Sequence, residues 1–118
     1  MTFPRTQKEI RRAIKDLPQT RFALESLRQQ RCYALPEDKE AITDRINQTA
    51  AYIGIMDDAM AHIPALDRDV LQICMDTEGA WQATLADTLK ISQPTACRRL
   101  HAALRSLQIA LTGEAADD

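Results

Sequence analysis

The chain has 118 residues, of which 15 are lysine or arginine and 17 are aspartate or glutamate, so its formal net charge at pH 7 is −2. This length allows one domain with an extension, and it excludes a sizeable enzyme with a separate regulatory part. Because non-specific nucleic-acid binders usually carry a high positive charge, any DNA binding by this chain must depend on where its charges lie.

The distribution of these charges is uneven. Residues 1–35 carry a net charge of +5, residues 36–80 carry −7, and residues 81–118 are balanced. No apolar run approaches the roughly 20 residues that a membrane span needs, and the N-terminus has no signal-peptide core. We therefore expect a cytoplasmic protein without membrane contact.

The cysteines do not form a pattern of disulfides or metal ligands. Cys32, Cys74 and Cys97 are widely spaced and include no C-x-x-C pair, which argues against a disulfide framework and against a zinc knuckle. Cys97 and His101 lie one helical turn apart, but a metal site needs further ligands that the chain hardly supplies. We expect reduced, partly buried thiols, no metal and no cofactor.

The N-terminal third predicts two helices. Five prolines divide the chain into helix-sized segments, and the apolar residues between them recur at helical spacing. This pattern predicts an all-α fold of five or six helices. Thr6 and Glu9 match a capping box that opens the first helix, and Pro18 predicts the end of that helix. The next helix is expected from about Thr20 to Ala34.

The following helix is expected to be the longest and to carry a coiled-coil seam. It begins at Pro36, where Glu37 and Asp38 suit the positive end of a helix dipole. Residues at four-three spacing form the seam: Ile42, Ile46, Thr49, Ile53, Met56, Met60 and Ile63. Such a seam needs a partner, which is either the first two helices of the same chain or the same helix in a second subunit, giving a homodimer.

The C-terminal half predicts two helices joined by a tight turn. After a short helix at about residues 67–75 and a turn at residues 76–79, another helix is expected at residues 81–89. Residues 90–92 form a three-residue turn, Ser92 is a good N-cap, and Pro94 falls in the first turn of the last helix. This arrangement predicts helix-turn-helix packing, with Ala96 and Leu100 buried.

Opposite the buried stripe, the last helix presents a polar and positive face. In a helix-turn-helix module the start of the second helix enters the major groove, so we expect some side chains to reach base edges and others to anchor phosphates. The candidates for base contacts are Gln93, Thr95, Cys97 and Arg98. The candidates for phosphate contacts are Lys90, Ser92, Arg99 and Arg105, and His101 lies on the same exposed face. The alternative is a plain three-helix core whose arginines are only solvated.

Two segments together resemble region four of sigma factors. Residues 60–71 combine an apolar helix, a step at Ile63-Pro64, the pair Asp67-Arg68 and an aliphatic helix. The second segment supplies the family's glycine loop, scaffold helix, turn and recognition helix, with these residues: Gly79, Leu85, Ala86, Leu89, Ile91, Ser92, Gln93, Pro94, Thr95, Arg98, Arg99, Leu100, Ala103, Leu104 and Leu107. The chain is most similar to small phage-encoded sigma-like regulators of the ArpU family.

The resemblance implies a DNA-binding transcriptional regulator that binds double-stranded DNA and can contact RNA polymerase. It covers residues 56–111, and the chain departs from the family pattern at Thr84 and Ala96. Nothing in residues 1–55 resembles the region that opens promoter DNA, so we do not expect a complete sigma factor. The predicted organisation is a helical extension (1–55), a DNA-binding domain (56–113) that folds alone, and a disordered acidic tail (114–118).

Two other functions fit the same residues. One is a helical adaptor that binds RNA polymerase or another protein through the acidic middle and the basic first helices. The other is a viral DNA-packaging component that uses the helix-turn-helix to hold DNA. An enzyme is not expected, because the sequence has no Gly-rich phosphate loop, no paired carboxylates in an apolar setting and no Ser, His and Asp arrangement that stands out.

Overall fold

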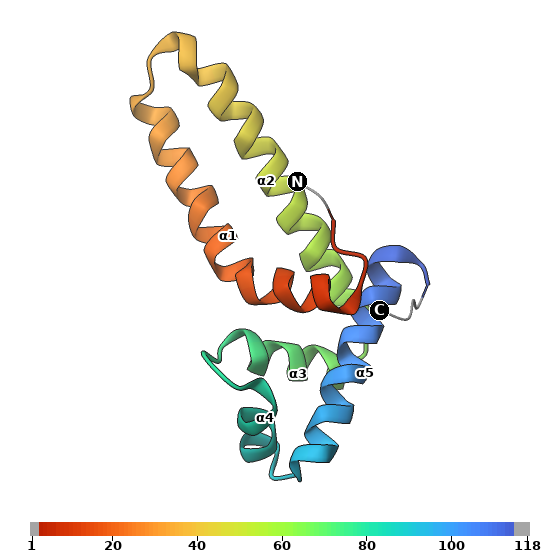
Figure 1. Cartoon of the computed structure of the whole chain (residues 1–118). Coiled ribbons are helices and arrows are strands. Elements are labelled where there is room, and N and C mark those ends of the chain that lie inside the picture. Colours follow the sequence, from red (N-terminus) through yellow and green to blue (C-terminus); the bar gives the residue numbers. More distant parts are fainter. Residues whose placement is uncertain (1–2, 115–118) are drawn as a thin grey trace.

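The computed structural model describes residues 3–114, and within this range the regular structure consists of helices alone, as predicted (Figure 1). Most of the acidic tail, residues 115–118, lies outside the described residues. The five helices are α1 (Gln7–Tyr33), α2 (Pro36–His62), α3 (Ala65–Met75), α4 (Trp81–Leu89) and α5 (Gln93–Thr112).

The predicted end of the first helix at Pro18 is wrong. α1 runs through Pro18 to Tyr33 as one helix, and Figure 1 shows that it bends between its first part and the remainder. Proline removes one backbone hydrogen bond and usually kinks a helix. The ring of Pro18 is exposed, and the hydroxyl of Thr20 donates to the Asp16 carbonyl at 3.1 Å. The helix therefore bends instead of ending, and no separate helix begins at Thr20.

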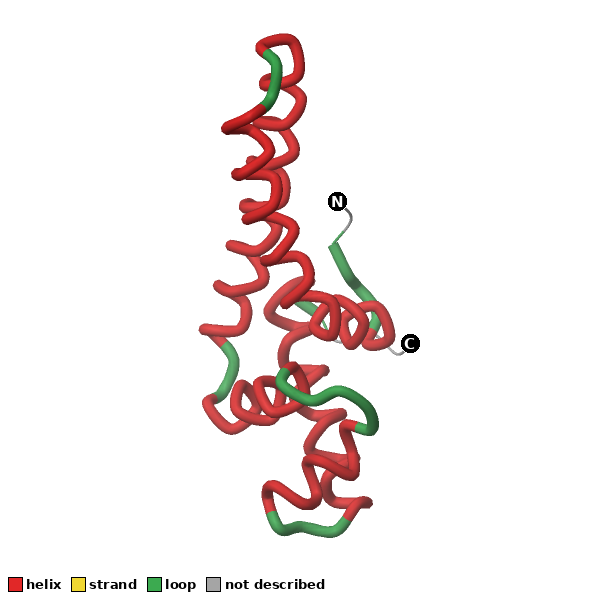
Figure 2. Tube along the Cα trace, turned by 90° about the vertical axis from the view of Figure 1, so that its left-hand side faces the viewer, coloured by secondary structure: helices red, strands yellow, loops and turns green. Residues whose placement is uncertain are grey.

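α1 and α2 form an antiparallel hairpin that projects from the other helices as a narrow arm (Figures 1 and 2). Its seam is closed within the chain, because the predicted seam residues from Ile46 to Ile63 are buried while Ile42 is half-buried. Arg21 and Asp57 form an ion pair between the two helices. The two helices predicted before Pro36 are the single helix α1, and α1 is the partner that the seam of α2 requires.

The first part of α1 belongs to the same core as the C-terminal helices. It packs against α3 and α5, and Ile10, Ile14 and Leu17 are almost completely buried in one continuous apolar cluster with residues of all the other helices. Two further contacts hold the segment before α1 in place. The side chain of Gln108 donates to the carbonyl of Arg5 at 2.8 Å, and the ring of Phe3 stacks on that of Tyr52 at 5.3 Å between centroids.

The step between α2 and α3 is fixed by Arg68. Its guanidinium donates to the carbonyls of Met60 at 3.2 Å and Ile63 at 3.3 Å, which are acceptors left over at the end of α2. The predicted boundary between residues 55 and 56 falls inside the continuous helix α2. None of the helices within residues 3–114 combines the length and the apolar character that crossing a membrane requires.

Candidate nucleic-acid interface

The turn between α4 and α5 lies where the sequence predicts it. α4 ends at Leu89, and Lys90 takes the left-handed conformation, with φ 56° and ψ 48°. The backbone N–H of Lys90 donates to the carbonyl of Ala86. The backbone N–H of Ile91 donates to the same carbonyl at 3.0 Å. A left-handed residue directly after a helix reverses the chain and satisfies the last carbonyls. The reversal at Lys90 allows α5 to begin only three residues later.

Ser92 opens α5. Its hydroxyl oxygen accepts from the backbone N–H of Thr95 at 3.3 Å and lies 2.9 Å from the Thr95 hydroxyl. Pro94 is in the first turn, where its missing N–H costs little. The N-cap and the proline position predicted from the sequence are both confirmed. The start of α5 is therefore capped by its own residues.

The two faces of α5 are divided as predicted. Ala96, Leu100 and Ala103 are almost completely buried and pack α5 against the rest of the molecule. Of the nine candidate DNA-binding residues, Thr95 is half-buried. The other eight are exposed: Lys90, Ser92, Gln93, Cys97, Arg98, Arg99, His101 and Arg105.

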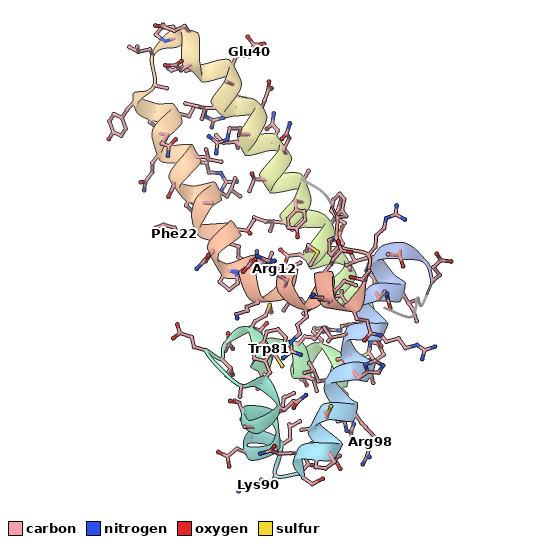
Figure 3. All side chains as sticks on the ribbon, in the orientation of Figure 1. Arg12, Phe22, Glu40, Trp81, Lys90 and Arg98 are labelled. Carbon is pink, nitrogen blue, oxygen red and sulfur yellow. The ribbon has the colours of Figure 1, made fainter. Side chains whose placement is uncertain are left out.

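The exposed part of α5 carries positive charge, and within residues 3–114 none of its basic side chains forms an ion pair with a carboxylate. α5 contains three arginines and one histidine, and it has no aspartate or glutamate. Within the described residues 3–114, ion pairs join Arg21 to Asp57 and Arg28 to Glu25, and neither pair involves α5. We call Arg98, His101 and Arg105 the basic face of α5. Figure 3 shows Arg98 and Lys90 at the end of the molecule opposite the hairpin tip near Glu40.

The structure divides the candidate residues into three groups. Arg98 lies beside the start of the helix and donates to the hydroxyl of Thr95 at 3.3 Å. Cys97 faces α4 instead, where its sulfur accepts from the amide of Gln82 at 3.4 Å. Arg99 projects from the other flank, about 160° around the helix axis from His101. Arg98 and Thr95 are thus brought together, while Cys97 and Arg99 point to opposite sides of them.

Sequence reasoning missed two basic residues of α1 that lie beside this surface. Lys8 and Arg11 line a hollow that they share with Cys97 and His101, and the guanidinium of Arg11 lies over the ring of Trp81, 5.0 Å from its centroid. The surplus of basic residues in the N-terminal third was visible in the sequence. Their position beside α5 was not, because it depends on the packing of segments about 90 residues apart.

Within residues 3–114, the remaining reactive groups are not gathered into a second site. Burial raises the pKa of the Cys74 thiol to about 11, so this thiol stays protonated at neutral pH. Cys32 and Cys97 are exposed, contrary to the expectation of partly buried thiols. In the part of the chain that the structure describes, no three histidine, cysteine or acidic side chains come together in a way that would hold a metal ion.

No family model, curated protein or solved structure matches this chain.

Proposed function

We propose that the unit formed by α4, the turn and α5 is a helix-turn-helix module that binds double-stranded DNA sequence-specifically, with α5 in the major groove. The observation that carries this proposal is the carboxylate-free basic face of α5, which starts at a tightly fixed helix N-terminus. A solvated surface helix usually mixes both signs of charge, whereas this one carries arginines alone.

The geometry suggests a different role for each group of side chains. Arg98 lies near the helix start and opposite the buried stripe, where a guanidinium can donate two hydrogen bonds to a guanine. Gln93, five residues earlier, is exposed at the first position of α5 and suits adenine. Lys90 in the turn and Arg99 and Arg105 along the helix are placed for phosphates, which fix the position of α5 but carry no sequence information.

Selection of bound sequences from a random DNA pool, followed by substitution of Arg98, tests the proposal. Arg98→Ala should weaken binding to the selected duplex by about 1 to 3 kcal/mol and relax the preference at one base pair. Arg105→Ala should weaken binding to all duplexes alike and lower the salt slope of log K by about one. Fluorescence anisotropy titrations of the selected and a scrambled duplex at several salt concentrations measure both effects.

Arg31→Ala is the matched control, because Arg31 is exposed near the far end of the hairpin and its loss makes the same change in net charge. It should leave both the affinity and the salt slope unchanged. Equal affinity of the wild-type protein for the selected and the scrambled duplex would contradict sequence-specific recognition. An Arg98→Ala variant that retains the full preference would contradict the base contact proposed for Arg98.

Within this proposal, a transcriptional regulator similar to sigma region four is the biological role that the sequence favours. Support comes from the step at Ile63-Pro64, where Arg68 ties α3 to the end of α2. Contact with RNA polymerase belongs to the same proposal. Co-purification of polymerase with the wild-type protein, and transcription from a promoter that carries the selected site, test this role.

The hairpin tip favours the helical adaptor as a second candidate. Tyr33 and Leu35 are 90% and 60% exposed at this tip, far from α5, and exposed apolar side chains are typical of protein contacts. A second copy of the chain is the simplest such partner, although the seam of α2 no longer requires one. Sedimentation of the wild-type protein and of a Tyr33→Ser, Leu35→Ser variant at high concentration distinguishes a dimer from a monomer.

A further inference from the structure

A hollow of about 230 Å³ lies between the start of α1, the start of α4 and the middle of α5. Among the described residues, its wall contains two basic side chains and one histidine, and no carboxylate. The residues that line it are Gln7, Lys8, Arg11, Gln82, Cys97, Leu100, His101 and Leu104. Such a wall offers hydrogen-bond donors and positive charge around a small apolar floor, which is the chemistry that holds an anionic oxygen group.

The nearby acidic side chain of α1 does not neutralise this hollow. The carboxylate of Glu9 accepts hydrogen bonds from the backbone N–H of Thr6 at 3.2 Å and from its hydroxyl at 3.1 Å. These bonds hold Glu9 in the capping box and lower the pKa of its carboxyl group. Within residues 3–114, neither Lys8 nor Arg11 forms an ion pair.

The backbone around the hollow is held in place from three directions. The capping box fixes the first turn of α1, the side chain of Gln108 in α5 binds the carbonyl of Arg5, and Arg11 stacks over Trp81 at the start of α4. Lys8 and Arg11 are therefore presented beside α5 by a rigid support, which lowers the entropy cost of binding an anion there.

The hollow adjoins the basic face of α5. With 3.6 residues per turn, His101 on its rim is about 60° from Arg98 and about 40° from Arg105 around the helix axis. Gln82, also on the rim, is the second residue of α4. When the second helix of a helix-turn-helix unit lies in the major groove, the first helix crosses the DNA backbone. A phosphate strand that leaves the groove at α4 would thus meet the hollow.

We propose that Lys8 and Arg11 bind a phosphate of the DNA backbone in this hollow, so that α1 extends the interface beyond the bases contacted by α5. The proposal depends on the DNA-binding function proposed above and adds a second element to it. It assigns the basic start of the N-terminal extension a direct role in holding DNA, in addition to its packing on α3 and α5.

The test compares Lys8→Gln with Lys39→Gln in the full-length chain. Lys8 is exposed, so its substitution does not disturb the core, and Lys39 is an exposed lysine near the hairpin tip. Two duplexes carry the selected site, a short one that ends at the selected bases and a longer one with about ten extra base pairs on each side. The measured quantity is the slope of log K against log salt concentration.

On the long duplex, Lys8→Gln should lower the salt slope by about one, as expected for one lost phosphate contact. It should leave the salt slope on the short duplex unchanged, and also the ratio of the affinities for the selected and the scrambled sequence. Lys39→Gln should change nothing. A further variant, Lys8→Gln with Arg11→Gln, removes both cations from the same phosphate, so it should also lower the slope by about one and should weaken binding to the long duplex more than Lys8→Gln does. Circular dichroism shows whether this variant remains folded.

An unchanged slope for Lys8→Gln on the long duplex, with Arg98→Ala still losing its preference, overturns this inference and leaves the proposed function intact. If Lys8→Gln lowers the salt slope equally on the short and the long duplex, the contact lies inside the selected site. That result would overturn the inference that α1 extends the interface beyond the bases contacted by α5. A wild-type protein that binds neither duplex overturns the inference together with the proposed function.

Discussion

Lys90 combines a strained backbone with a charge that we propose to contact DNA. Among the described residues it is the one residue other than glycine with a positive φ, a conformation that costs an ordinary residue about 1 to 2 kcal/mol. Glycine avoids this cost but loses about 0.4 to 1 kcal/mol through the greater entropy of its unfolded chain. Lys90→Gly should therefore raise the free energy of unfolding by about 0.5 to 1 kcal/mol, measured by urea denaturation, while it weakens DNA binding.

Lys90→Gln separates these two effects, because it removes the same charge and keeps the strained conformation. It should weaken DNA binding as much as Lys90→Gly does, without the gain in stability. A loss of stability in Lys90→Gly would mean that the lysine side chain contributes more to the turn than its backbone costs.

Gln108 is a fully buried polar residue that joins α5 to the segment before α1. Its amide nitrogen donates to the Arg5 carbonyl, while its amide oxygen has no hydrogen-bond partner among the described residues. Gln108→Glu keeps the shape but places a carboxylate in this apolar site. Burial should raise the pKa of that carboxyl group in the folded state, so folding should be destabilised by roughly 3 kcal/mol at pH 7.

The sign of the pH effect follows from this raised pKa. Below about pH 4 the carboxyl group is protonated in both states and can donate to the Arg5 carbonyl, so the variant should approach wild-type stability. As the pH rises through the unfolded pKa toward the folded one, stability should be lost. Urea unfolding of variant and wild type at pH 4 and pH 7 measures the difference, and a pH-independent difference would show that the site admits water.

At the scale of single elements, α1 shows how tertiary packing overrides a local signal. A proline inside a helix costs about 3 kcal/mol, which is why the sequence predicts an end at Pro18. Beyond Pro18, however, Leu24 and Leu27 are buried against α2, and each such side chain contributes about 1.5 to 3 kcal/mol. The burial of these two leucines offsets the cost of the proline, provided that the helix continues beyond Pro18 with a bend. This balance depends on α2, so local sequence does not reveal it.

The unit of α4, the turn and α5 was predicted closely because its signals are local. The N-cap Ser92, the proline two residues later and the alternation of buried and exposed positions all lie between Trp81 and Thr112. The hollow beside α5 could not be predicted in the same way. It requires Lys8 to meet His101 and the Arg5 carbonyl to meet Gln108, and no periodicity indicates contacts between segments so far apart in the chain.

At the scale of the whole molecule, the arm and the body have different characters. The described chain extends 56 × 29 × 22 Å, and its long dimension runs along the hairpin of α1 and α2 and continues through the body to the turn between α4 and α5 (Figure 2). The tip of the hairpin has few buried side chains, whereas its base shares one apolar cluster with α3, α4 and α5. The basic face and the core that supports it therefore lie at one end, and the tip is free for other contacts.

This shared cluster predicts that the body unfolds as one unit, together with the first part of α1. Ile14 in α1 and Leu107 in α5 are both completely buried, so Ile14→Ala and Leu107→Ala should each cost about 2 to 5 kcal/mol. Circular dichroism reports all the helices, and the single tryptophan, Trp81, reports the start of α4. If the core is one cooperative unit, each substitution should lower the urea midpoint of the circular dichroism signal and that of the Trp81 fluorescence by the same amount.

An Ile14→Ala variant whose Trp81 midpoint stays at the wild-type value would instead support the sequence-based prediction that residues 56–113 fold alone. In that case α1 would stabilise only the hairpin. In the cooperative case α1 supports α5 directly, because losing the packing of Ile14 also loosens the helix that we propose to lie in the major groove.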